Sequence, residues 1–122
     1  MKLTLESRGK HLIRGYAEGE VRVDDQTIHH NCVISADQIA EWQVSQQFTK
    51  EEIAPILALN PELVIVGLKD MQNLPPAATY AVFLERGIGF EVMDVGAACR
   101  TFNILISEDR RVVAALVLKS LQ

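Results

Sequence analysis

The first third of the chain alternates short apolar or β-branched stretches with polar ones, the pattern of strands that expose one face to water. Residues 12–17 and 20–23 flank a break that contains glycine, and residues 27–34 follow a turn at Asp24 and Asp25. Because these three stretches are short and joined by turn residues, they predict an antiparallel meander.

The period changes at Thr49, where the sequence predicts a short helix. Thr49 and Glu52 have the spacing of a capping box, and apolar residues recur at helical intervals until Asn60 and Pro61 end the segment. Residues 62–67 then form an almost continuous apolar run bounded by turn residues. Such a run is typical of a central strand that is covered on both faces.

A second helix is predicted after Pro75 and Pro76, whose fixed φ angles suit a helix start. Arg86 and Gly87 provide a stop signal for it. The side chains expected to form its inward stripe are Ala77, Tyr80, Ala81 and Leu84.

The second half of the chain alternates strands and helices. Residues 88–93 predict a strand, Asp94 is placed to cap a helix that runs to about residue 106, and residues 111–118 predict a final strand. A strand, helix, strand unit packs with parallel strands and a right-handed crossover, so the strands at 62–67 and 88–93 are expected to be parallel. The direction of the final strand stays open. The alternation predicts an α/β fold.

Size and composition agree with one domain spanning residues 1–122. The chain is 48% hydrophobic, which is enough for one core at this length. Its 12 basic and 16 acidic residues give a net charge of −4, and the basic residues are scattered, which disfavours nucleic-acid binding. No apolar segment approaches the roughly 20 residues that cross a bilayer. Two cysteines are too few for a disulfide framework, so we expect a cytoplasmic protein without direct membrane insertion.

The clearest candidate site lies where the two parallel strands end. Loops that leave the carboxyl ends of neighbouring parallel strands share one edge of the sheet, where α/β folds usually bind ligands. Here they are the loop from Gly67 to Asn73 and the helix start over residues 94–100, which we expect to face each other. The candidate residues for binding a ligand or a partner are Gly67, Lys69, Asp94, Gly96, Ala97, Ala98, Cys99, Arg100 and Asn103.

The composition of this site favours an anionic ligand. Backbone amides at a helix start lack intrahelical partners, and the helix dipole adds positive potential there. Arg100 and Lys69 could hold a carboxylate or a phosphate, whereas Asp94 competes by capping the amides itself. In the alternative interpretation, the small residues only let the helix pack closely on the sheet. The sequence lacks a phosphate loop and the second glycine of a dinucleotide fingerprint, so nucleotide cofactors are not expected.

Cysteine chemistry and metal binding have weaker support. Cys99 lies in the first turn of the helix beside Arg100, where dipole and charge favour a thiolate, but its apolar neighbours favour a buried thiol. On a strand, His30 and Cys32 share one face and His29 lies on the other. Because two ligands do not make a structural zinc site, we predict no metal and no cofactor.

Part of the second half resembles the Mth938-like domain family. The similar segments are residues 62–67, 86–94, 97–105 and 111–116. The most specific motif is the strand end Glu91-Val92-Met93-Asp94 followed by Ala98-Cys99-Arg100-Thr101-Phe102-Asn103. The resemblance implies a single α/β domain with a mixed central sheet, helices packed over it and no established catalytic activity. The chain departs from the family at Gly67-Leu68-Lys69, where Gly-Thr-Gly is frequent.

Three functions are compatible with these observations. The first is a non-catalytic interaction module with a protein partner, because the resemblance implies a bacterial relative of a mitochondrial respiratory complex I assembly factor that acts through partners. The alternative is a domain that binds a small anionic ligand at the candidate site. The least favoured is an enzyme with Cys99 as nucleophile. Trp42 is expected in the core rather than as an interface anchor, since indole rings are usually buried.

Overall fold

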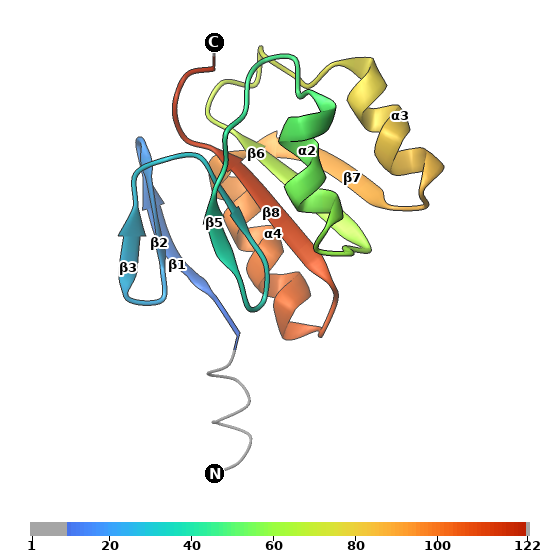
Figure 1. The fold of residues 1–122 in the computed structure, drawn as a ribbon. Helices are drawn as coiled ribbons and strands as arrows, with labels where there is room; N and C mark the ends of the chain where they lie inside the picture. The colour runs from blue at the N-terminus through green and yellow to red at the C-terminus, as the bar shows by residue number, and fades with distance from the viewer. Residues whose placement is uncertain (1–9, 122) are drawn as a thin grey trace.

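The computed structural model describes residues 10–121, which form two sheets and three helices (Figure 1). The strands are β1 (Ile13–Ala17), β2 (Glu20–Val23), β3 (Gln26–Ile28), β4 (Cys32–Ile34), β5 (Ile39–Glu41), β6 (Leu63–Leu68), β7 (Gly89–Asp94) and β8 (Val112–Val117). The helices are α2 (Lys50–Leu57), α3 (Ala77–Glu85) and α4 (Val95–Ser107).

The central sheet has five strands in the order β5-β4-β8-β6-β7. β6 is parallel to both of its neighbours, β7 and β8, whereas β4 is antiparallel to β8 and to β5. The sheet is therefore mixed, and the predicted parallel pairing of β6 with β7 is confirmed. β8, whose direction the sequence left open, runs parallel to β6 and lies between β6 and β4.

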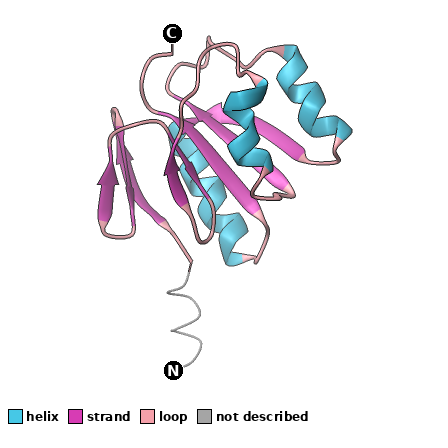
Figure 2. Ribbon diagram, in the orientation of Figure 1, coloured by secondary structure: helices cyan, strands magenta, loops and turns pink. Residues whose placement is uncertain are grey.

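Helices cover both faces of the central sheet (Figure 2). On one face, α4 and the small sheet of β1, β2 and β3 share a core that includes Val23, Ile65 and Phe102. On the other face, α2 and α3 share a core that includes Ile56 and Phe83. Every residue of β8 is buried, as are all residues of β6 except the first. Burial on both faces explains why these strands read as continuous apolar runs.

The predicted meander is confirmed for β1, β2 and β3, but residues 27–34 do not form one strand. The chain leaves the small sheet after β3 and enters the central sheet at β4. Asn31 lies between them, and its Oδ1 accepts hydrogen bonds from the backbone N–H groups of Leu118 at 2.7 Å and Lys119 at 2.9 Å. These bonds tie the crossing point to the end of β8, which the local sequence pattern does not reveal.

α2 begins with the predicted capping box. The Thr49 side chain accepts a hydrogen bond from the Glu52 backbone N–H, and the Glu52 carboxylate accepts one from the Thr49 N–H at 3.0 Å. Burial opposes ionisation of Glu52, but hydrogen bonds from Ser45 and Thr49 outweigh it and lower the pKa of Glu52. Trp42 is 3% exposed and donates its Nε1–H to the Glu52 carbonyl at 2.8 Å, so it is a core residue.

The inward face of α3 differs from the predicted stripe. Thr79 and Phe83 are the buried residues of this helix, whereas Leu84 is 75% exposed. Phe83 stacks on Phe90 of β7 with ring centroids 4.7 Å apart, and Tyr80 meets Phe90 edge-on at 5.0 Å. α3 carries apolar residues on every side, so its sequence does not define one face and the contact with Phe90 selects it. Ala77 and Ala81 of the predicted stripe are exposed.

Candidate functional site

The two segments predicted to face each other start from paired strand ends. In the register of β6 and β7, Gly67 pairs with Met93 and Leu68 pairs with Asp94. The loop that begins at Lys69 and the start of α4 are therefore neighbours at the carboxyl edge of the parallel strands. β6 extends to Leu68, so Gly67 lies inside the strand rather than in the loop.

The start of α4 is capped and covered. Asp94 is the N-cap residue, and its Oδ1 accepts a hydrogen bond from the Ala97 N–H at 2.9 Å. Gly96 is buried under Tyr16, because a Cβ at this position would lie 2.5 Å from the Tyr16 Oη. Arg100 donates from Nη1 to the same Tyr16 Oη at 2.8 Å. The end of β1 thus covers the helix start at which the sequence predicted an anionic ligand.

A hollow of about 280 Å³ lies between the β1–β2 turn, the end of β6 and the start of α4. We call it the hairpin pocket, and its lining residues are Tyr16, Ala17, Glu18, Gly19, Leu68, Lys69, Asp94, Val95, Gly96 and Leu118. It is slightly smaller than the roughly 300–1,000 Å³ typical of small-molecule and cofactor sites. The β1–β2 turn forms one wall of the pocket. The sequence did not predict this wall, because no local signal in the turn places it against α4.

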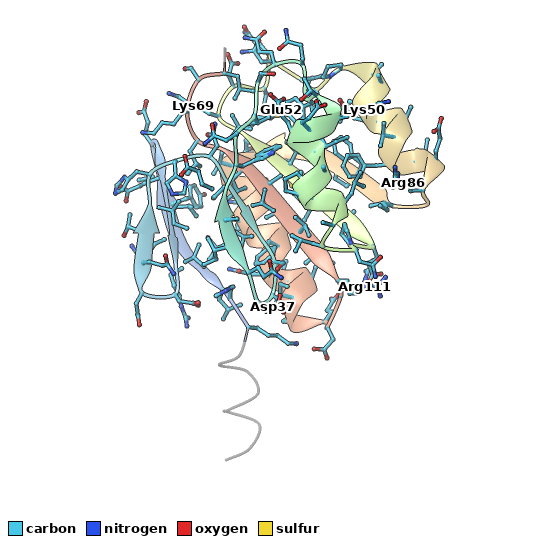
Figure 3. The ribbon with its side chains drawn as sticks, viewed as in Figure 1. Asp37, Lys50, Glu52, Lys69, Arg86 and Arg111 are labelled. Carbon is cyan, nitrogen blue, oxygen red and sulfur yellow. The ribbon has the colours of Figure 1, made fainter. Side chains whose placement is uncertain are left out.

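Two lysines at this edge of the sheet have no carboxylate partner among residues 10–121. Lys69 lines the pocket, and its direction from the end of β6 can be followed in Figure 3. The Lys119 Nζ packs on the β1–β2 turn, 3.3 Å from where a Cβ on Gly19 would be. The pocket lining also holds two carboxylates, the exposed Glu18 and Asp94, which caps α4. Asp70 in the loop after β6 accepts from the Gln72 N–H at 2.9 Å.

Large apolar side chains are exposed on the segments that reach this edge. Tyr16 is 48% exposed, and Met71 and Leu74 in the loop after β6 are 43% and 53% exposed. A second hollow of about 130 Å³ shares Lys69 and Leu68 with the hairpin pocket. We define the carboxyl-edge surface as Tyr16, Lys69, Met71, Leu74 and Lys119. Adjacent apolar and basic groups of this kind suit a polar-rimmed interaction site.

Other candidate residues have structural contacts. A Cβ on Gly67 would lie 2.8 Å from the Ala98 Cβ and 2.8 Å from the Leu116 Cδ2, so glycine here lets α4 pack closely on β6. Asn103 lies on the side of α4 that faces β1, where its Oδ1 accepts from the Ile13 N–H at 2.9 Å and its Nδ2 donates to the Ile13 carbonyl at 2.8 Å. These contacts match the close-packing interpretation of the small residues.

The thiols are buried and protonated at neutral pH. Burial raises the pKa of Cys99 to about 11, and this effect outweighs the opposing influence of Arg100. Burial likewise raises the pKa of Cys32 to about 12, with a smaller contribution from Cys99. Over residues 10–121, no group of three or more histidine, cysteine, aspartate or glutamate side chains is placed to hold a metal ion.

A larger hollow of about 590 Å³ lies at the opposite end of the sheet, beside Asp37 and Arg111 in Figure 3. Its charged rim is largely paired within the chain. Lys10 forms an ion pair with Asp109, and Arg110, also on the rim, pairs with Glu62 at 2.9 Å. Arg111 on the same rim donates from Nε to the Asn60 carbonyl at 3.2 Å.

The fold and this edge define the class of the protein. A family model described as "Protein of unknown function (DUF498/DUF598)" matches residues 13–117, which run from β1 to β8. A solved structure from Xanthomonas campestris has 32% sequence identity and a TM-score of 0.79, covering 92% of this chain and 87% of that one. The class is therefore a single small α/β domain with a mixed central sheet, as predicted.

A second solved structure gives the family its name. It is a Mth938-like domain of Bordetella pertussis, with 25% sequence identity and a TM-score of 0.70 over 92% of this chain and 88% of that one. The chain belongs to the Mth938-like family.

Two relatives carry descriptive names. The "13 kDa major membrane protein" of Francisella tularensis subsp. holarctica is 29% identical over 106 residues, which cover 84% of this chain and 86% of that protein. The "NADH dehydrogenase (ubiquinone) 1 alpha subcomplex assembly factor 3" of Bos taurus is 33% identical over 110 residues, which cover 86% of this chain but 59% of the bovine protein. Within residues 10–121, no helix is both long and apolar enough to cross a bilayer.

Proposed function

We propose that this protein is a non-catalytic interaction module, with the whole chain as one domain, that binds a protein partner during assembly of a respiratory complex. The observation that carries the proposal is its similarity to the bovine assembly factor across 86% of the chain. We also propose that the protein lies in the cytoplasm and contacts membrane complexes through its partner. The contact with membrane complexes, not the cytoplasmic location, is supported by the name of the Francisella relative.

The carboxyl-edge surface supports this function physically. Interfaces are enriched in aromatic residues and methionine, and Tyr16, Met71 and Leu74 are large apolar side chains that stay exposed at one edge. The surface is also held in place without a partner, because Arg100 fixes Tyr16 and Asp70 orders the loop that carries Met71. A rigid, partly apolar surface loses little conformational entropy on binding.

Affinity purification from the native organism tests the proposal. A tagged protein at near-endogenous expression should retain a stoichiometric protein partner, identified by mass spectrometry. The double variant Met71→Ser, Leu74→Ser should lose it, because both side chains lie on the carboxyl-edge surface. The matched control is Ile104→Ser, which changes an apolar side chain that is 57% exposed on α4.

Two results would contradict the proposal. Absence of any specific partner in the wild-type purification removes the interaction function itself. Equal loss of the partner in Ile104→Ser and in the double variant moves the interface away from the carboxyl-edge surface. Circular dichroism of each variant verifies that the fold is retained.

A small anionic ligand in the hairpin pocket is the second candidate function, favoured by the apolar hollow beside Lys69. It has less support because Asp94 already caps α4 and Arg100 already bonds Tyr16. Under this function, phosphate or a short-chain carboxylate should raise the melting temperature of the wild type, and Arg100→Ala should abolish the rise. An equal rise in the variant would remove Arg100 from the site.

A further inference from the structure

The outer edge of β7 is open. β7 is the last strand of the central sheet, and within residues 10–121 it pairs only with β6 (Figure 1). β7 has six residues, no proline and no register shift against β6, whereas β5 at the opposite edge has three residues. Proteins usually shorten, bulge or cover an edge strand, because its unpaired N–H and C=O groups can pair with another strand. The long, regular edge of β7 therefore offers a place for a further strand.

The backbone of β7 presents alternate residues to this edge. The Gly89 N–H donates to the Glu62 carbonyl at 3.0 Å, so the backbone groups of Gly89 point toward β6. Successive residues of a strand point their N–H and C=O groups to opposite sides. Glu91 therefore also bonds β6, whereas the backbone groups of Phe90 and Val92 point outward and are available to a new strand.

The flank of α3 above this edge is apolar and exposed. Tyr80 meets Phe90 of β7 edge-on at 5.0 Å, so the Tyr80 flank of α3 lies above β7. Ala77 and Leu84, three positions before and four after Tyr80, share this flank, and both are exposed. Glu85 lies on the other side of the helix. The stripe that the sequence predicts as inward-facing is thus left uncovered by a single copy of the chain.

We infer that a second copy of this chain covers the edge, with the two β7 strands antiparallel about a two-fold axis at Phe90. Phe90 of each copy exchanges backbone hydrogen bonds with Phe90 of the other, and the Val92 N–H donates to the Ile88 carbonyl of the other copy. The axis is perpendicular to the sheet, so the two five-stranded sheets join and the two α3 flanks meet on one face. This dimer goes beyond the proposed function and does not use the residues of the carboxyl-edge surface.

The side chains of β7 disfavour the neighbouring registers. Outward residues must pair with outward residues, so an axis through the middle of β7 passes at Phe90, Glu91 or Val92. An axis at Glu91 sets the two Glu91 carboxylates directly opposite each other, and opposed like charges destabilise a strand pair. An axis at Val92 sets the Phe90 ring against Asp94 of the other copy.

An axis at Phe90 removes both conflicts. Glu91 then faces Gly89 of the other copy, which has no side chain. Arg86, in the turn before β7 (Figure 3), comes opposite Asp94 of the other copy, and the two-fold axis repeats this pair of opposite charges. Arg86 has no ion-pair partner within residues 10–121, and the cap of α4 uses only Oδ1 of Asp94. The edge of β7 is therefore complementary to itself.

Sedimentation velocity of the full chain over a concentration series into the millimolar range tests the dimer. Interfaces of one strand and one helix flank are small and associate weakly, so the fraction of dimer should rise with concentration. Val92→Pro removes an outward N–H, which the monomer does not use, and should weaken the dimer at least about fivefold through two lost hydrogen bonds.

The matched control is Glu41→Pro at the other edge of the sheet. The Trp42 N–H donates to the Asn31 carbonyl, so the N–H of Glu41 points away from β4 and the monomer does not use it either. Glu41→Pro should dimerise like the wild type. Circular dichroism of each variant verifies that the fold is retained.

Amide hydrogen exchange locates the contact. The Phe90 and Val92 amides should exchange rapidly in dilute protein and become protected as the concentration rises. The Glu91 amide, which bonds β6, should be protected throughout.

A charge exchange tests the register. Arg86→Glu and Asp94→Arg should each weaken the dimer at least about twofold, because each sets like charges opposite each other. An equimolar mixture of the two variants restores both opposite pairs in a mixed dimer and should recover association. Lys50→Glu, which makes the same change of charge on α2, should have no effect.

Several results overturn the inference. They are a monomer at every concentration, association of Val92→Pro equal to that of Glu41→Pro, and no recovery in the mixture of charge variants. If the chain is monomeric and an affinity-purified partner is lost in Val92→Pro but kept in Glu41→Pro, the edge binds a strand of that partner instead. The proposed function fails separately, when the affinity purification yields no partner, whether or not the chain dimerises.

Discussion

Asn103 joins α4 to β1 through both ends of its side-chain amide. We expect Asn103→Leu to lower the free energy of unfolding by about 1–3 kcal/mol, because it leaves the Ile13 N–H and carbonyl without their partners. Urea denaturation measures the loss. Ile104→Ala, at the neighbouring exposed position, should stay within about 0.5 kcal/mol of the wild type. Equal losses in the two variants would contradict a specific role for the amide.

The buried thiols make stability depend on alkaline pH. Burial raises the pKa values of Cys99 to about 11 and Cys32 to about 12, from an ordinary value of 9.0. Between pH 9 and 11 the folded state therefore holds protons that the unfolded state has lost, and the free energy of unfolding falls as pH rises through this window. Urea denaturation at a series of pH values measures this fall.

The double variant Cys32→Ala, Cys99→Ala isolates the contribution of the thiols. Lysines and tyrosines titrate in the same range, so the wild type alone does not assign the effect. We expect the double variant to lose less stability than the wild type between pH 9 and 11. Identical slopes would show that the two thiols do not carry the effect. At pH 8, iodoacetamide should also alkylate the native wild type much more slowly than the urea-unfolded protein.

At the scale of elements, α4 depends on its N-cap. Asp94→Ala removes the hydrogen bond to the Ala97 N–H and a negative charge near the positive end of the helix dipole. We expect a loss of about 0.5–2 kcal/mol in the free energy of unfolding, measured by urea denaturation. Glu108→Ala changes the net charge equally at the other end of α4, where a negative charge is unfavourable, and should cause no loss. A comparable loss of stability in both variants would contradict a stabilising role for the Asp94 cap.

The packing of α3 gives a test with two adjacent residues. Phe83 is fully buried against Phe90, so Phe83→Ala should cost about 3–5 kcal/mol, and a smaller side chain cannot refill the space. Leu84 is 75% exposed, so Leu84→Ala should change stability by less than about 0.5 kcal/mol. Thermal denaturation of both variants measures the difference. The opposite ranking would restore the inward stripe predicted from the sequence.

At the scale of the whole molecule, the features that could be predicted from the sequence are those that depend on neighbouring residues. The capping box at Thr49 and the cap at Asp94 follow from side chains that bond their own helix. The position of β6 inside the sheet, covered on both faces, follows from its continuous apolar run. Each of these features is determined by residues within a few positions of one another, so the prediction needed no knowledge of the rest of the fold.

Features that depend on residues far apart in the chain could not be predicted. Arg100 and Tyr16 are 84 positions apart, Asn103 and Ile13 are 90 apart, and Asn31 and Leu118 are 87 apart. These pairs decide where the β1–β2 turn lies and where the chain crosses between sheets. The candidate site was predicted from its β6 and α4 sides, whereas the hairpin wall and Lys119 came only from the structure.

The central position of β8 also affects how the protein is made. β4 with β5 and β6 with β7 are translated earlier, yet these two half-sheets do not pair with each other, because β8 lies between them. During translation, the edges of β4 and β6 that pair with β8 therefore stay open until residues 112–117 have left the exit tunnel of the ribosome. Unpaired edges invite wrong pairing, and the nascent chain is most exposed to aggregation and to chaperones during that interval. Folding of the central sheet is completed after synthesis of β8 rather than progressively along the chain.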